Sequence, residues 1–212
     1  MLDIKIADAD ISYGFSCYEK YLPLLSNERK EKIARLKFDK DKILSLFSGL
    51  LIRNEIQQKL GISDDKISFS YNKHGKPFLN NYPNFHFSVS HSGKCAVIIS
   101  DDCQIGIDIE ENSSAKIEIA KRFFSPNEYK YILESENPDS TFYEIWTKKE
   151  AYLKMIGTGL ATPLSSFDVM SDELCSLFYT MQYSTYSISI CSEKIKQGIV
   201  PTLNNQYFIY NK

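Results

Sequence analysis

The chain has 212 residues, with 25 Lys and Arg against 27 Asp and Glu, and 43% of its residues are apolar. This length suits one large domain or two small ones, and the apolar content excludes an intrinsically disordered chain. A net charge of −2 argues against a dedicated nucleic-acid-binding protein, although it is compatible with a local basic patch for a smaller anion.

Membrane and secretion signals are not recognised in the sequence. No stretch approaches the roughly 18 apolar residues of a membrane helix, and the N-terminus lacks the basic and apolar regions of a signal peptide. The five cysteines form no C-x-x-C pair and no zinc-binding cluster. We therefore expect reduced, mostly buried thiols in a cytoplasmic protein that does not associate with membranes.

The first half of the chain shows two stretches with helical signals and three β-rich runs. These are predicted helices over 26–36 and 42–60 and predicted strands over 66–70, 85–90 and 94–100. Ser26 is the expected N-cap of the first helix, and Gly61 the expected end of the second. The last two strands are expected to form a hairpin around His91, Ser92 and Gly93.

The second half shows the same kinds of signal. These are predicted strands over 105–110, 165–169 and 186–192 and predicted helices over 125–134 and 141–156. Ser125 and Glu128 have the spacing of a capping box, with Pro126 at the first helical position, and Gly157 ends the last helix. The pattern predicts an α+β protein with mainly antiparallel strands.

A faint internal repeat relates the two halves. Residues 34–42 resemble residues 120–128, and each segment precedes a helical stretch that ends at a glycine. The repeat predicts two similar lobes, 1–103 and 104–212, each a small sheet packed with helices. The alternative is a chance similarity, because the spacing between matching segments drifts.

The strand over 105–110 carries two carboxylates on one face. Its isoleucines alternate with Asp108 and Glu110, which lie about 6.7 Å apart along the strand. Two like charges at this distance are tolerated on a solvated edge, or when a hard cation such as Mg²⁺ or Mn²⁺ lies between them. Taken alone, this short pattern favours the solvated edge.

The helix over 141–156 carries a lysine in its apolar stripe. Lys149 lies at the centre of that stripe, Glu150 lies at its edge, and Lys154 follows one turn later. One interpretation is a lysine that extends to solvent beside a Glu–Lys pair of small energy. The other is a third metal-binding carboxylate, with two cations for phosphate oxygens. The helix alone leaves both open.

The turn Ser90-His91-Ser92-Gly93 does not have the arrangement of a hydrolase site. Neighbouring strand residues point to opposite faces, so Ser90 and His91 are badly placed as nucleophile and base. The turn suits anion binding or a simple polar hairpin. Basic residues also gather at 28–42 and 73–76, but the chain contains neither a Walker sequence nor G-x-G-x-x-G.

Five motifs, in this order, resemble the phosphopantetheinyl transferase family, in its larger monomeric type that activates carrier proteins of peptide and polyketide synthetases. They are GKP at 75–77, FSVSHSG at 87–93, GIDIE at 106–110, FFSPNE at 123–128 and WTKKEAYLK at 146–154. The resemblance covers about residues 20–170, and the GIDIE and WTKKEAYLK motifs are its most specific part.

The resemblance implies a fold and an activity. The fold is a two-lobed α+β pseudo-dimer with coenzyme A in the cleft between the lobes. The reaction is a Mg²⁺-dependent transfer, with Mn²⁺ as a substitute, of the phosphopantetheine arm of coenzyme A to a serine of an apo acyl or peptidyl carrier protein. Adenosine 3',5'-bisphosphate leaves. The implied partners are coenzyme A and a transiently bound carrier of peptide, polyketide or fatty-acid biosynthesis, with no nucleic acid.

The resemblance also implies roles for particular residues. Asp108, Glu110 and Glu150 would bind the metal, and Glu150 would take the proton from the carrier serine, directly or through a metal-bound water. Lys154, together with Lys149, would stabilise or protonate the leaving phosphate. Glu128 is a weaker candidate, because its capping role explains it equally well. The residues implied in coenzyme A binding are Arg29, Lys32, Ser45, Gly75, Lys76, Pro77, Ser90, His91, Lys149 and Lys154.

Three residues depart from the family pattern, and two other functions compete with the one that the resemblance implies. Ile43 and Leu44 stand where basic residues are common, and Lys94 stands where an aromatic residue is common after the S-H-S-G turn. A non-catalytic module that binds coenzyme A or carrier protein would not need the carboxylates and lysines. An unrelated Mg²⁺-dependent phosphotransferase would need a phosphate loop, and none is recognised.

Overall fold

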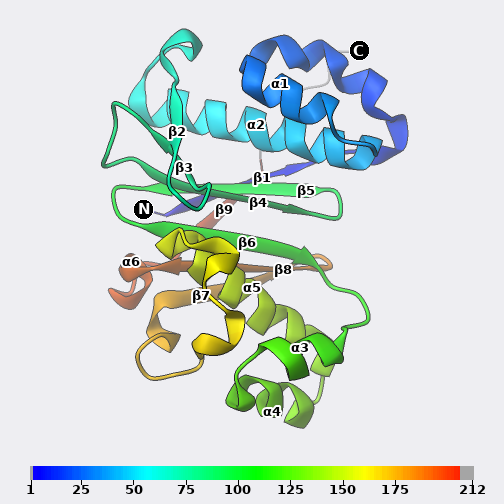
Figure 1. Ribbon diagram of the computed structural model, residues 1–212, viewed down its shortest axis with the longest axis vertical. Helices are drawn as coiled ribbons and strands as arrows, with labels where there is room; N and C mark the ends of the chain where they lie inside the picture. Colours follow the sequence, from blue (N-terminus) through cyan, green and yellow to red (C-terminus); the bar gives the residue numbers. More distant parts are fainter. Residues whose placement is uncertain (1, 206–212) are drawn as a thin grey trace.

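The helices and strands stack in four layers (Figure 1). The computed structural model describes residues 2–205, without the side chain of residue 64. Helix α2 (Asp39–Leu60) covers one face of a four-stranded sheet, and a three-stranded sheet lies on the other side of it. Helix α5 (Pro138–Ile156) lies beneath the second sheet. The predicted α+β class with small sheets is confirmed.

The two sheets have the strand orders β4-β5-β1-β9 and β6-β8-β7. The first contains β1 (Asp3–Asp8), β4 (His86–Ser92), β5 (Cys95–Asp101) and β9 (Thr202–Asn205). The second contains β6 (Ile105–Glu111), β7 (Phe178–Tyr183) and β8 (Tyr186–Ser192), and β2 (Phe69–Tyr71) pairs separately with β3 (Pro77–Leu79). The described pairings are antiparallel, except that β1 and β9 run parallel.

Strand β9 carries the end of the described chain back to the first half. Its pairing with β1 aligns Thr202 with Asp3. The predicted division into lobes 1–103 and 104–212 therefore does not describe strand β9, which belongs to the sheet of the first half. Pairing between opposite ends of a chain leaves no local sequence pattern from which it could be predicted.

The predicted helices are present, with shifted starts. The other helices are α1 (Asn27–Ala34), α3 (Ile117–Phe123), α4 (Pro126–Glu134) and α6 (Glu193–Lys196). Helix α2 begins at Asp39 instead of residue 42, because Asp39 and Asp41 interact favourably with the positive end of the helix dipole. Helix α5 begins three residues before its predicted start, with Asn137 as its N-cap.

The predicted helix caps are confirmed. The Ser125 Oγ accepts from the backbone N–H of Glu128 at 3.1 Å, and the Glu128 side chain accepts from the backbone N–H of Ser125 at 2.8 Å. Helices α2 and α5 end at Gly61 and Gly157, whose φ angles of 65° and 71° suit glycine in the left-handed region.

Most predicted strands are confirmed, and one is wrong. The runs over 85–90, 94–100, 105–110 and 186–192 lie in β4, β5, β6 and β8. The run over 66–70 contributes only its last two residues to β2. The segment 165–169 is not a strand but begins in a short 3₁₀ turn, Leu164–Ser166. The Lys149 ammonium donates to the backbone carbonyls of Leu164, just before this segment, and of Phe167 within it, which takes the place of pairing with a strand.

A continuous apolar core joins the two sheets. It contains Ile105, Ile107 and Ile109 from β6, all fully buried, together with apolar side chains of β1, β5 and β8. The alternation predicted for β6 is confirmed, because Asp108 and Glu110 lie on the opposite face, toward α5. The two halves therefore share a core.

Strands β4 and β6 are edge strands of the described sheets, and side chains connect them. The connecting side chains are three alternate serines of β4, the hydroxyl row: Ser88, Ser90 and Ser92. Ser88 Oγ accepts from the backbone N–H of Ile107 at 3.0 Å, and the other two hydroxyls donate to Asp108 and Glu110, each at 2.7 Å. Hydroxyls thus replace a backbone ladder along this seam.

The five cysteines are all free thiols, as predicted. Cys95 and Cys191 are buried, but Cys17 and Cys175 are exposed, so the expectation of mostly buried thiols is wrong for these two. Over residues 2–205, none of the helices is both long and apolar enough to cross a membrane.

Gly106 lets helix α5 lie directly on strand β6. A Cβ atom at this position would overlap the carbonyl oxygen of Ala151 and lie 2.6 Å from the backbone nitrogen of Met155. Backbone atoms in a packed helix cannot move away as a flexible side chain can, so the contact requires glycine.

We predict that Gly106→Ala lowers the free energy of unfolding by about 3 kcal/mol or more, because α5 must separate from β6. Gly49→Ala in α2 is the matched control, since the nearest neighbours of its Cβ would be side-chain atoms, the tip of Leu25 at 2.9 Å and Arg29 Cγ at 3.4 Å. The control should stay within about 1 kcal/mol of the wild type, because the higher helix propensity of Ala offsets the small shift of Leu25. Urea titration measures both, and equal midpoints for Gly106→Ala and the wild type would contradict the close approach.

Candidate active site

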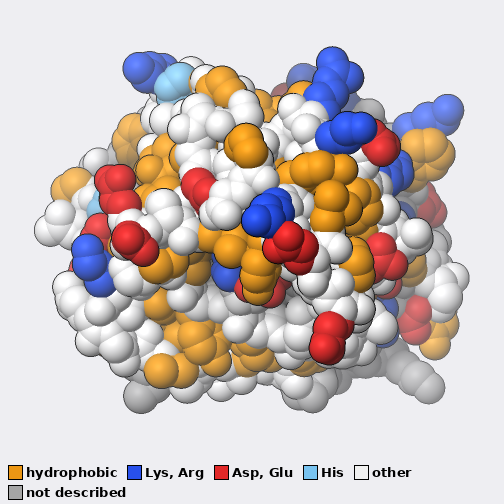
Figure 2. Space-filling view, turned by 90° about the horizontal axis from the view of Figure 1, so that it is seen from below, with side chains coloured by type: hydrophobic (Ala, Val, Ile, Leu, Met, Phe, Trp, Pro, Cys, Tyr) orange, Lys and Arg blue, Asp and Glu red, His pale blue; other side chains and the backbone are white. Residues whose placement is uncertain are grey.

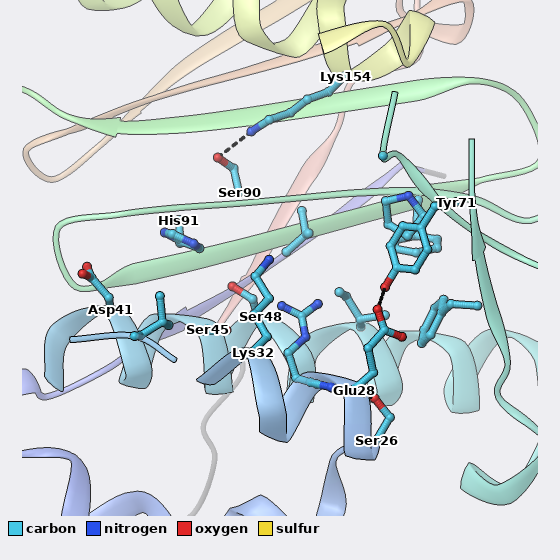
Figure 3. Close-up of a pocket in the computed structure, with 18 residues that line it drawn as sticks. Ser26, Glu28, Lys32, Asp41, Ser45, Ser48, Tyr71, Ser90, His91 and Lys154 are labelled. Carbon is cyan, nitrogen blue, oxygen red and sulfur yellow. Dashed lines mark hydrogen bonds between the residues drawn. The ribbon is translucent and has the colours of Figure 1, made fainter. Parts of the chain in front are cut away.

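A cavity of about 530 Å³ opens between the first two helices and strand β4 (Figure 3). Helices α1 and α2 form one wall, and β2, β4 and the turn before β3 form the other. Lys154 is the residue of helix α5 that lines it, so the second half contributes to a cavity formed mainly by the first. The lining includes Ser26, Glu28, Arg29, Lys32, Asp41, Ser45, Ser48, Tyr71, Gly75, Pro77, Ser90, His91 and Lys154.

Four basic side chains converge on this cavity. Arg29 and Lys32 come from α1, His91 from β4 and Lys154 from α5. Burial lowers the pKa of Arg29, Lys32 and His91, and the nearby Lys154 ammonium lowers the pKa of His91 further. Burial disfavours the charged form of each of these groups, and a bound anion would compensate for the hydration that they lose.

Lys154, Ser90 and Asp108 form a triangle at the edge of the cavity. The Lys154 ammonium donates to Asp108 Oδ1 and to Ser90 Oγ, and Ser90 Oγ donates to the same Oδ1, all at 2.7 Å. Asp108 Oδ2 is buried and has no hydrogen-bond partner among the described residues. A buried carboxylate oxygen without a partner is costly unless a ligand satisfies it.

Two more carboxylates lie beside Asp108. Burial raises the pKa of both Glu110 and Glu150, and the negative charge of Asp108 raises each pKa further. Ser92 donates to Glu110 Oε2 at 2.7 Å, and both this bond and the Trp146 side chain act to lower the pKa of the same carboxylate. Three mutually repelling carboxylates with one unpartnered oxygen fit a divalent cation that prefers oxygen ligands.

The three carboxylates do not yet form a tight ligand cluster. Within residues 2–205, the acidic or thiol side chains that bring three ligand atoms within 4.8 Å of one another are Asp101, Asp102 and Cys103. Lys194 already forms ion pairs with both of those aspartates. Asp108 Oδ1, in contrast, forms an ion pair with the Lys154 ammonium. A metal ion bound here would therefore require the three carboxylates to move closer to one another.

Eight of the predicted coenzyme A-binding residues line the cavity. They are Arg29, Lys32, Ser45, Gly75, Pro77, Ser90, His91 and Lys154. The alternation of β4 places Ser90 Oγ on the face toward β6, while His91 interacts electrostatically with Lys32 and Asp41 of the helices. The argument against a Ser–His hydrolase pair therefore agrees with the structure.

Lys76 does not extend into this cavity. Its ammonium donates to the backbone carbonyls of Ile105 at 3.4 Å and Met155 at 3.1 Å, and burial lowers its pKa to about 8. Asn72, in the same turn, donates to the carbonyl of Gly157 at 2.7 Å. Lys76 and Asn72 thus brace the turn against the C-terminal end of α5, where a cation interacts favourably with the helix dipole, and the phosphate contact of Lys76 stays a prediction.

Lys149 does not extend into the cavity either. Its ammonium lies in the core at 0% exposure, forms an ion pair with Glu128 at 2.7 Å, and donates to the carbonyls of Leu164 and Phe167. The Glu128 carboxylate, also at 0% exposure, completes the capping box and accepts from the backbone N–H of Val169. The pair fixes the loop after α5, and Lys149 would have to leave the core to reach a phosphate.

Several cavity residues were not identified from the sequence. Tyr71 and Glu28 belong to opposite walls, and the Tyr71 hydroxyl donates to Glu28 Oε1 at 2.6 Å (Figure 3). Glu28 could have been identified as a cavity residue, because it directly precedes the predicted coenzyme A-binding residue Arg29 in α1. Tyr71 is exposed in a short strand and gives no such signal. Ile43 and Leu44, the departures from the family pattern, are buried in the core.

Two family models match consecutive parts of the chain. One, described as the 4'-phosphopantetheinyl transferase superfamily, matches residues 104–208, and the other, described as 4'-phosphopantetheinyl transferase, N-terminal, matches residues 15–103.

Curated relatives agree with the family models. The 4'-phosphopantetheinyl transferase Sfp of Bacillus subtilis is 37% identical over 153 residues, which cover 71% of this chain and 68% of the relative. The 4'-phosphopantetheinyl transferase gsp of Aneurinibacillus migulanus is 37% identical, with coverages of 73% and 65%. The human L-aminoadipate-semialdehyde dehydrogenase-phosphopantetheinyl transferase is 32% identical, with coverages of 66% and 51%.

Among solved structures, the holo-[acyl-carrier-protein] synthase of Thermotoga maritima aligns with a TM-score of 0.34 and 18% identity. The alignment covers 41% of this chain and 60% of that one. This likeness is too low to support an assignment of the fold.

The placement of Lys149 makes a testable prediction. Lys149→Met should lower the free energy of unfolding by about 3–5 kcal/mol, because it leaves the buried Glu128 carboxylate without its cation. The KM for coenzyme A should stay unchanged in the folded variant, since Lys149 is not in the cavity. Lys32→Met is the matched control, with near-normal stability and a raised KM. If Lys149→Met instead raised the KM for coenzyme A and left stability normal, the buried placement would be contradicted and Lys149 would be assigned to the cavity.

Proposed function

The chain belongs to the 4'-phosphopantetheinyl transferase superfamily and is an enzyme that transfers phosphopantetheine to carrier proteins, and from this premise we propose how its residues divide the reaction. The observation that carries the proposal is the triangle of Lys154, Ser90 and Asp108. It places a cation and a carboxylate from two different elements at the edge of an anion-binding cavity.

The cavity would bind the nucleotide end of coenzyme A. Arg29, Lys32 and His91 offer positive or proton-donating groups to phosphate oxygens, and the Ser45 hydroxyl lies among them without a hydrogen-bond partner in the described chain. Gly75 and the neighbouring Pro77 would border the adenine. The lowered pKa values of the three basic groups support this assignment, because a bound phosphate would compensate for the hydration that these groups lose on burial.

Asp108, Glu110 and Glu150 would hold a Mg²⁺ or Mn²⁺ ion. The unpartnered Asp108 Oδ2 and the raised pKa values of the two glutamates fit such an ion. When bound, the metal supplies positive charge next to the pyrophosphate of coenzyme A. A module that only binds coenzyme A has no use for one buried and two half-buried carboxylates gathered in one place, which favours the enzyme over the non-catalytic alternative.

Glu150 and Lys154 would move the protons. The carrier serine forms an O–P bond to the phosphorus attached to pantetheine, while the P–O bond to the adenosine bisphosphate breaks. Glu150 would accept the serine proton, since burial has raised its pKa toward the range of a useful general base. Lys154 would donate to the departing phosphate, so that adenosine 3',5'-bisphosphate leaves with its new charge neutralised.

The proposal also covers the oligomeric state, the location and the partner of the enzyme. We expect a monomer in the cytoplasm, and an apo acyl or peptidyl carrier of peptide, polyketide or fatty-acid synthesis as a transient partner. We also propose that the two halves form a pseudo-dimer with coenzyme A between them. In support, α2 and α5 each cover the outer face of a sheet, and each ends at a left-handed glycine.

The assignment of Glu150 predicts that Glu150→Gln reduces transfer at least 100-fold, because the amide cannot accept the serine proton. Mass spectrometry of an apo carrier protein after incubation with coenzyme A and Mg²⁺ measures the gain of phosphopantetheine. Glu144→Gln is the control on the same helix, since Glu144 pairs with Lys148 outside the cavity. Transfer by Glu150→Gln at the rate of the control would contradict the assignment of Glu150 as the proton acceptor.

A further inference from the structure

The last member of the hydroxyl row has a fixed orientation. Ser92 Oγ accepts from the backbone N–H of Glu111 at 3.1 Å and contacts Glu110 Oε2 at 2.7 Å. A hydroxyl has one proton, and a backbone N–H can only donate, so that proton points to Glu110. The bond is charge-assisted, because an ionised carboxylate is the acceptor.

The Glu110 carboxylate accepts a hydrogen bond across the seam from Ser92 of β4. Glu110 itself stands on β6, the strand that packs between β4 and α5. A directional bond from a neighbouring strand limits how the carboxylate can rotate, although burial and the nearby Asp108 charge raise its pKa.

Ser88 is a member of the hydroxyl row that bonds to the backbone of β6 but not to a carboxylate, so it serves as a comparison for Ser92. It stands on the same face of the same strand, and its Oγ likewise accepts one backbone N–H across the seam, that of Ile107 at 3.0 Å. No carboxylate contact is recorded for Ser88 among the described residues. The two serines therefore make the same structural bond, and the bond to Glu110 is what distinguishes Ser92.

We infer that Ser92 is a positioning residue that sets the Glu110 carboxylate for metal binding across the seam between the two sheets. The inference rests on the proposed function, in which Glu110 binds the cation. Contacts of this kind orient carboxylate ligands, and their loss weakens metal binding about 10- to 100-fold. Ser92 would thus connect the packing of β4 against β6 to the affinity of the site for its ion.

Titration with Mn²⁺, followed by the loss of the free-ion electron paramagnetic resonance signal, tests this inference on the full chain with coenzyme A present. Ser92→Ala should raise the Kd for Mn²⁺ by about 10-fold or more. Ser92→Thr should restore it to within about threefold, because the hydroxyl returns and a β-branched residue suits a strand. Ser88→Ala is the matched control, with a Kd within about twofold of the wild type, since it leaves one backbone N–H without its acceptor just as Ser92→Ala does.

Melting temperatures of all variants separate loss of binding from loss of folding. We expect Ser88→Ala to lower the melting temperature at least as much as Ser92→Ala, because the Ile107 N–H that loses its acceptor is buried, whereas the Glu111 N–H is exposed to water. The inference is overturned by an unchanged Kd for Ser92→Ala, by an equal rise of the Kd for Ser88→Ala, or by no Mn²⁺ binding to the wild type. Failure of the wild type to label any carrier would contradict the proposed function instead, and the Mn²⁺ titration would still decide the role of Ser92.

Discussion

The structure depends on a seam between two edge strands that no backbone ladder joins. Strands β4 and β6 end their respective sheets, and the hydroxyl row of β4 provides the hydrogen bonds between them. The isoleucine-rich core next to the seam holds the sheets together, while the hydroxyls determine how the two edges align. A seam made by side chains can also form part of an active site. A serine hydroxyl can donate to a carboxylate, whereas the groups of a backbone ladder are used up by hydrogen bonds to the neighbouring strand.

The site follows from this arrangement. The acidic face of β6 points toward α5, and the basic cavity lies on the side of α1 and α2. The Lys154 side chain crosses from α5 to meet Ser90 at the boundary. The net charge of −2 therefore conceals separated regions of opposite sign. The space-filling view from below shows acidic and basic side chains scattered among apolar ones on that face (Figure 2).

Local patterns predicted the parts of the fold that local physics determines. Ser125 and Glu128 cap α4, Gly157 ends α5, and the alternation of β6 separates its isoleucines from Asp108. The position of Lys149 in an apolar stripe left open whether it extends to solvent or neutralises a buried group. Helical periodicity could not show that Lys149 pairs with the capping residue Glu128. Nor could it show that the Lys149 ammonium also donates to backbone carbonyls of the loop after α5. Strand β9 and the roles of Lys76 and Tyr71 were also missed, because each depends on contacts between segments distant in sequence.

The central claim is that the carboxylates at the seam and the basic cavity form one site. Anomalous diffraction from crystals grown with coenzyme A and Mn²⁺ tests it most directly. The account predicts one strong anomalous peak bounded by Asp108, Glu110 and Glu150, with the nucleotide phosphates beside Arg29 and Lys32. A peak at Asp101 and Asp102 instead, or coenzyme A bound outside the cavity, would contradict it.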